Sequence, residues 1–176
     1  MATARETQLI SIFDPANFKS TKELAAAEWD KALGNSYVHA HDSTTSSTSA
    51  WADVVWTTES VDVLGEFNGT IFTAQRAGIY AVSANVITAS YAWGTGPNGD
   101  IQMGISKNNA STTGPVFYQS FHIVEAAITT SIALNVSCIM NLAAGDTLRV
   151  KYYAARTGGV ASALTGGCGF MIARIQ

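Results

Sequence analysis

The amino-acid sequence predicts an all-β protein, an antiparallel sandwich or barrel, preceded by a short arm and one α-helix. From Trp51 onward, apolar side chains recur at every second position, which is the period of a strand with one buried face. Turn-forming clusters such as GTGPNGD, AAGD and LTGG separate these runs. No helical periodicity follows residue 42, so we expect the runs to pair as antiparallel strands.

Residues 1–42 differ from the rest of the chain in charge. Ten of them are charged, against 13 of the 134 residues that follow. The strand-prone run TQLISIF ends at Asp14-Pro15, and Ser20 with Glu23 forms a capping box that begins a predicted helix ending near Gly34. These short elements cannot form a core of their own, so we expect them to dock either on the β domain of the same chain or, as an anchor, on another protein. The anchoring candidates are Leu9, Ile10, Ile12, Phe13, Leu24, Trp29 and Leu33.

The Ser/Thr-rich residues 43–50 are predicted to be a linker or an extended strand at the rim, and residues 51–176 a β head. Four runs in the head have clearly alternating faces. Their predicted core positions are Tyr80, Val82, Ala84 and Val86; Ile101, Met103 and Ile105; Ile132, Leu134, Val136, Cys138, Met140 and Leu142; and Leu148, Val150 and Tyr152.

Gly145 and Asp146 lie between the last two of these runs. Because the apolar faces of the two runs are in phase, and because Gly and Asp tolerate the backbone angles of tight turns, Asp146 is predicted to be a turn residue rather than a catalytic acid.

Composition excludes several classes of partner. A net charge of -3 and a pI near 5.5 give no basic surface for nucleic acid, and no apolar run approaches the ~20 residues that span a bilayer. The N-terminus lacks a secretory signal, so synthesis in the cytoplasm without export is expected. Cys138 and Cys168 are too few for a disulfide framework, and buried thiols are the favoured interpretation.

The search for reactive groups gives two weak candidates. His39, His41 and Asp42 could form a metal set on an extended segment, although two solvated histidines are the simpler interpretation, and no cofactor is predicted. Glu59 and Asp62 are the closest acidic pair in the head. A spacing of three in a strand is expected to put them on opposite faces, which disfavours a glycan-cleaving enzyme.

Five further residues are candidates for contacts outside the core. Exposed aromatic side chains can stack on sugars or fill a partner's pocket, although core or subunit contacts are the simpler role. Arg174 alternates with Phe170 and Ile172 and is a candidate for a subunit junction. The aromatic candidates are Tyr91, Trp93, Tyr118 and Phe121.

The head resembles the C1q/TNF-like jelly roll, in the version common in bacteriophage and bacterial proteins. The segment VVWTTESVDVLGEFNGTIFTAQRAGIYAVSANV carries the first half of the pattern, and ISKNN, LNVSCIMNLAAGDTLRVKYY and GFMIARI carry the second. Gln75 stands where the family usually has Pro. The matching positions of the first half are Trp56, Glu59, Asp62, Phe67, Phe72, Thr73, Ala74, Gly78, Ile79, Tyr80, Ser83, Ala84, Asn85 and Val86.

The resemblance implies a non-enzymatic homotrimer. Together with the two-part layout, it suggests a structural protein of a bacteriophage virion: a capsid decoration or head-fibre protein on the capsid surface, anchored through residues 1–42 to the major capsid protein or another virion protein. The alternative is a receptor-binding or adhesion tip of a tail fibre that recognises a host surface glycan or protein.

Overall fold

The computed structural model describes residues 36–47, 50–88, 91–93, 99–108, 118–124, 128–155, 162–163 and 166–176. These residues belong to one unit, Asn35–Gln176. Every regular element in this described part is a strand, which confirms the predicted all-β class. The predicted helix lies outside the described residues.

The first sheet has five antiparallel strands in the order β11-β6-β14-β1-β4. Its central strands carry alternating apolar residues, and this period lets one face pack against the core. The bounds of its strands are Ala133–Leu142 for β11, Gly78–Ile87 for β6, Gly169–Arg174 for β14, Tyr37–Ser43 for β1 and Trp56–Asp62 for β4.

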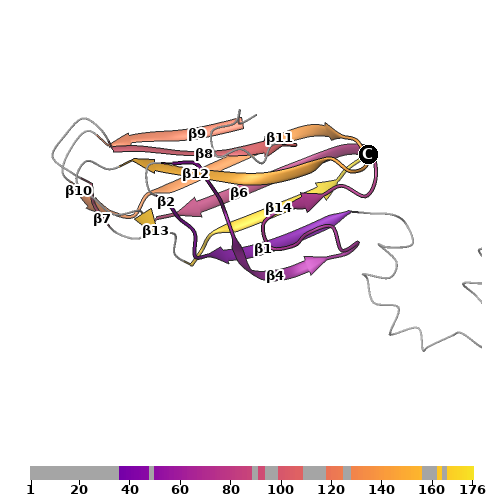
Figure 1. The fold of residues 1–176 in the computed structure, drawn as a ribbon, viewed down its shortest axis with the longest axis horizontal. Helices are drawn as coiled ribbons and strands as arrows, with labels where there is room; N and C mark the ends of the chain where they lie inside the picture. Colours follow the sequence, from indigo (N-terminus) through magenta and orange to yellow (C-terminus); the bar gives the residue numbers. More distant parts are fainter. Residues whose placement is uncertain are drawn as a thin grey trace, which may run out of the picture. The chain divides into compact units, whose positions relative to one another are not determined.

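The second sheet has the order β3-β12-β8-β9, and β5 also pairs with β12. Its layer lies opposite β1, β4 and β14 (Figure 1). The bounds are Ala52–Asp53 for β3, Thr147–Ala155 for β12, Gly99–Lys107 for β8, Tyr118–Val124 for β9 and Phe72–Thr73 for β5. Two small sheets pair β7 (Tyr91–Trp93) with β10 (Ile128–Thr130), and β2 (Ser46–Ser47) with β13 (Ser162–Ala163).

One hydrophobic core joins the two large sheets. The ring of Phe72 from the second sheet meets the ring of Tyr80 from the first edge-on, with centroids 5.7 Å apart. Trp56 stacks on Phe170 at 5.9 Å. The alternation predicted in the sequence is confirmed, because the predicted core positions are buried except Cys138 and Met140, which are partly buried against the core.

Strand β1 lies inside the segment that the sequence analysis assigned to the arm. Val38 and Ala40 are fully buried, and β1 pairs with β14 on one side and β4 on the other. The β domain therefore includes residues 37–42, and the Ser/Thr-rich segment contains the short strand β2, which agrees with the alternative of an extended strand there.

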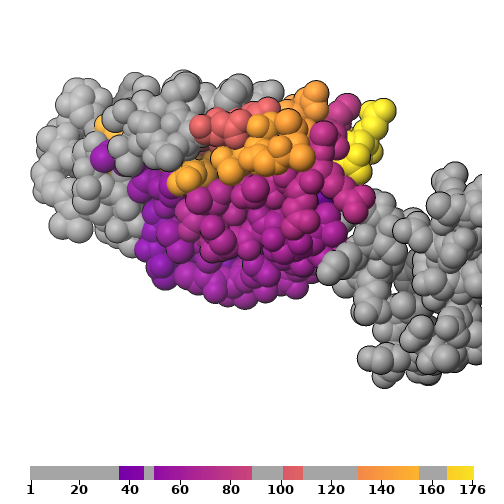
Figure 2. All heavy atoms as spheres, turned by 45° about the vertical axis from the view of Figure 1, so that its right-hand side comes forward, coloured from indigo at the N-terminus to yellow at the C-terminus, as the bar shows by residue number. Residues whose placement is uncertain are grey.

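The C-terminal residues extend the first sheet beyond β14. The amide of Ile79 donates to the carbonyl of Gln176 at 2.8 Å, and the amide of Ile175 donates to the carbonyl of Ile79 at 2.8 Å. In Figure 2 the C-terminal residues, in yellow, lie beside magenta residues of the range 50–88. Gly78 permits this arrangement, since a Cβ there would lie 2.2 Å from the Gln176 carbonyl oxygen.

Candidate functional site

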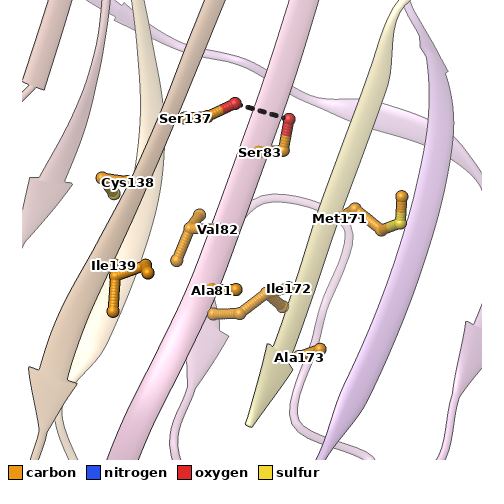
Figure 3. A pocket seen from close by; sticks show the side chains of 9 residues that line it. All are labelled: Ala81, Val82, Ser83, Ser137, Cys138, Ile139, Met171, Ile172 and Ala173. Carbon is orange, nitrogen blue, oxygen red and sulfur yellow. Dashed lines mark hydrogen bonds between the residues drawn. The ribbon is translucent and has the colours of Figure 1, made fainter. Parts of the chain in front are cut away.

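The solvent-facing side of the first sheet carries a shallow, largely apolar depression of about 480 Å³. Figure 3 shows the side chains that line it, on the neighbouring strands β11, β6 and β14. We call this side of β11, β6, β14 and β1 the solvent face. The lining residues are Ala81, Val82, Ser83, Ser137, Cys138, Ile139, Met171, Ile172 and Ala173.

The depression forms because small side chains on the central strand lie between large ones on its neighbours. Ser83 of β6 pairs in register with Ser137 of β11 and Met171 of β14, while Ala81 pairs with Ile139. The Ser83 and Ser137 hydroxyls are hydrogen-bonded at 3.0 Å (Figure 3). This bond uses the O–H donor of one serine and an acceptor site of the other, so the surface between them is less polar than two separate hydroxyls would make it.

The large residues beside the depression are exposed. Ile139 is 63% exposed and Met171 is 44% exposed. An antiparallel sheet with one face in water normally carries polar residues there. Exposed apolar residues grouped on one sheet face are typical of an interaction surface.

The two cysteines do not supply a nucleophile. Both are free thiols in the structure. Burial raises the pKa of the Cys138 thiol to about 11, so it is protonated at neutral pH and reacts slowly. Cys168 is buried, and its sulfur accepts a hydrogen bond from the Ile87 amide at 3.3 Å.

The three weak metal-ligand candidates, His39, His41 and Asp42, lie at the β1 edge of the same face. The rings of His39 and His41 have centroids 5.9 Å apart, and His41 Nδ1 lies 2.9 Å from Asp42 Oδ2. Asp42 has a positive φ of 56°, and its Oδ1 accepts a hydrogen bond from the Gly167 amide at 3.4 Å. Among the residues whose positions are described, no group of three or more His, Cys, Asp or Glu side chains is arranged to hold a metal ion.

The expectation that Glu59 and Asp62 lie on opposite faces is wrong. A bulge in β4 shifts the register, so that Glu59 pairs with Ala40 and Asp62 pairs with Val38, which puts both acids on one side of the sheet. However, the carboxylate oxygens of Asp62 each accept a backbone amide, from Glu66 and Phe67, both at 2.9 Å. Asp62 therefore holds the loop that follows β4.

Glu66 is a buried acid that the sequence analysis did not identify. It is 3% exposed, and its carboxylate accepts hydrogen bonds from the Ser36 hydroxyl and, at 2.7 Å, from the Gln75 amide. Burial, followed by the charge of Glu66, raises the pKa of Tyr80. Proline has no backbone N–H, so a proline at position 75 could not donate this hydrogen bond to Glu66. Gln75 therefore gives this chain a contact that members of the similar family with Pro at this position lack.

The interpretation of Asp146 as a turn residue is confirmed. Its amide donates to the carbonyl of Ala143 at 3.1 Å, and Gly145 before it has a φ of 89°. The carboxylate binds Asn108 Nδ2 at 2.6 Å, Lys107 Nζ at 2.7 Å and the Ala143 amide at 2.7 Å. These contacts, that of Asn108 first, lower the pKa of Asp146 to about 2.

Replacing Asp146 with Ala is expected to lower the free energy of unfolding by about 1–2 kcal/mol near neutral pH, because three donors lose a charged acceptor. Because the folded-state pKa of Asp146 is lowered, its carboxylate contributes fully to the free energy of unfolding above about pH 4. This contribution is lost as the pH falls toward 2. Urea denaturation of both proteins, at equal protein concentration, should show the difference shrinking across this window. A difference that stays constant down to pH 2 would contradict the assignment.

Several predicted contact residues fall outside what the structure describes. Leu9, Ile10, Ile12, Phe13, Leu24, Trp29 and Leu33 lie outside the described residues. Tyr91 and Trp93 lie on β7, and Tyr118 and Phe121 on β9, but their side chains are outside the described part. Arg174 ends β14, and its Nε donates to the carbonyl of Ala77 at 3.1 Å.

The sequence matches no protein-family model and no curated protein. In the described part of the chain, no helix has the length and apolar character needed to cross a membrane.

Solved structures with the same arrangement of strands do exist. The crystal structure of murine APRIL at pH 5.0 has 15% sequence identity and a TM-score of 0.57, over 80% of this chain and 99% of that chain. The globular domain of zebrafish complement 1qA has 13% identity and a TM-score of 0.57, over 81% and 98%. Eiger TNF from S. frugiperda has 16% identity and a TM-score of 0.53, over 80% and 94%. The chain therefore has the C1q/TNF-like jelly-roll fold that the sequence predicted.

Proposed function

We propose that this protein is a non-enzymatic structural module that assembles as a homotrimer through the solvent face of its first sheet. The observation that carries the proposal is the apolar depression beside exposed Ile139 and Met171. None of the described residues that line the depression is charged. Charged residues are depleted at the centre of protein interfaces, where large apolar side chains are enriched.

A second copy of the chain is the occupant that best fits this surface. The face offers both protruding side chains, Ile139 and Met171, and a recess floored by small ones, Ala81 and Ser83. Copies of one chain can bury such a face against each other and close the assembly by rotational symmetry. Three copies is the number that the family resemblance of the sequence implies.

Substituting Ile139 with Asp is expected to convert the full-length protein from a trimer, with a mass near three times 18.5 kDa, into a monomer. The carboxylate would have to be buried without a partner, which costs several kcal/mol per copy, roughly enough to dissociate most assemblies of this size. Light scattering measures the mass directly. Val55→Asp is the matched control, since Val55 is 45% exposed and does not line the depression. A trimeric Ile139→Asp variant, or a monomeric wild-type protein, would refute the proposed face.

The finer part of the proposal concerns the virion. We propose that the trimer is a capsid decoration or head fibre of a bacteriophage, made in the host cytoplasm and attached to the major capsid protein or another virion protein through residues 1–35. The support is the sequence resemblance to phage-type jelly rolls and the high charge and helix signal of the N-terminal segment.

Immunogold electron microscopy of purified phage particles tests this role. Labelling distributed over the capsid supports decoration, and the full-length Trp29→Ala variant should then label less while keeping the mass of the wild-type assembly. Labelling at the tail tip would overturn the capsid assignment in favour of a receptor-binding role, and particles without label would overturn the virion role.

A further inference from the structure

The outward side chains of β1 add two histidines to the solvent face. His39 pairs in register with Met171 of β14 and Val61 of β4, and His41 pairs with Gly169 and Thr58. His39 also lines a small hollow of about 90 Å³ together with Ser83 and Met171, which both line the apolar depression. The histidines and the depression therefore belong to one continuous surface.

Few charges face these two rings from the elements around them. Asp42 is the adjacent carboxylate, bonded to His41 Nδ1 at 2.9 Å, and the phenol of Tyr37 lies on the same side of β1. Glu59 lies on the other side of the sheet, where it pairs with Ala40. The groups that neighbouring strands present to the rings are uncharged: Gly169, Met171 and Ala173 from β14, Thr58 and Val61 from β4, and Ser83 and Asn85 from β6.

We propose that protonation of His39 and His41 releases the assembly, so that the trimer formed at neutral pH dissociates in mild acid. This inference rests on the proposed function, because it requires that copies of the chain meet on the solvent face. The partner is a second copy of this chain, which presents the apolar, uncharged surface described above.

The direction of the effect follows from solvation and linkage. Covering an imidazole with an apolar surface favours its uncharged form, because the charged form loses its hydration. The separated chains then bind protons that the trimer excludes, and association weakens as the pH falls. Two charged rings with centroids 5.9 Å apart also repel each other. The carboxylate of Asp42 offsets the charge on His41. We therefore expect His39 to cause most of the weakening of association at low pH.

Light scattering of the full-length protein at about pH 7.5 and about pH 5.5 tests the inference, because histidine changes charge between these values. We expect the wild-type protein to be trimeric at the higher pH and to associate at least about 100-fold more weakly at the lower pH, with an unchanged far-UV circular dichroism spectrum. The double variant His39→Gln/His41→Gln should stay trimeric at both values. His39→Lys, which carries a permanent charge, should be monomeric at both.

His122→Gln is the matched control, since His122 lies on β9 of the second sheet, and it should behave as the wild-type protein does. A wild-type monomer at about pH 7.5 would refute the proposed function itself. A wild-type trimer that persists at the lower pH, or a double variant that dissociates as the wild type does, would overturn the histidine inference and leave the trimer in place.

Discussion

Replacing Asp53 with Ala is expected to cost about 3–5 kcal/mol of unfolding free energy, the range for breaking a buried ion pair. Asp53 pairs with Lys151, whose side chain is only 3% exposed, and its Oδ2 also lies 2.7 Å from Arg149 Nη1. Removing the carboxylate leaves the Lys151 ammonium buried without its ion-pair partner, Asp53 being the acidic residue paired with it in the described part of the chain. Chemical denaturation at a fixed protein concentration measures the loss.

The double variant Asp53→Ala/Lys151→Met is the control for this interpretation. It removes the buried ammonium together with its partner, and it should recover stability to within about 1 kcal/mol of the wild-type protein. Arg149 can remain, because its side chain is 19% exposed and reaches water. A double variant as unstable as Asp53→Ala would show that the loss comes from another contact of Asp53.

Phe72→Ala should be the most damaging truncation in the core, with an expected loss of about 3–5 kcal/mol. Phe72 is fully buried and connects the sheets, since β5 pairs with β12 while its ring meets Tyr80 of β6. The cavity left by the ring would lie between the two layers, where neither sheet can move without disturbing the other.

Phe72→Leu separates this cavity from the loss of the aromatic contact. Leu fills most of the space, so the expected loss is about 1–1.5 kcal/mol. The two variants are compared in urea at the same protein concentration. Equal losses for Leu and Ala would contradict the assignment of Phe72 as the residue that fills the space between the sheets.

The sequence predicts the strands well because their signal is local. Alternation in β6, β8, β11 and β12 reports which side chains face the core, and burial follows it closely. The turn at Asp146 is equally local, since Gly145 adopts the positive φ that the sequence suggests.

Other features depend on partners that are distant in the chain. Lys151 alternates as an outward residue of β12 but is buried, and strand pairing brings the counter-charge of Asp53 beside it. The bulge that puts Glu59 and Asp62 on one side exists only in the pairing of β4 with β1. The sequence of β1 does carry a strand pattern, since Val38 and Ala40 alternate with Tyr37, His39 and His41. The prediction placed this segment in the arm because the first 42 residues are rich in charge.

The sequence alone predicts only part of the solvent face. Ile139 alternates with the core positions of its strand, but the depression arises from Ser83 and Ala81 of one strand lying between residues of two others. The sequence of one strand does not indicate which strands lie beside it. The depression can therefore be recognised only when the order of strands in the sheet is known.

Oxidation of Met171 by hydrogen peroxide, followed by peptide mass spectrometry, tests most directly whether other copies cover the solvent face. Met171 is 44% exposed in the single chain, while Met103 is fully buried and serves as the internal reference. We expect Met171 to be protected in the wild-type protein at neutral pH and to be oxidised much faster in the Ile139→Asp variant, whose copies are separate. Rapid oxidation of Met171 in the wild-type protein, at the rate seen in the variant, would show that no other copy covers the solvent face.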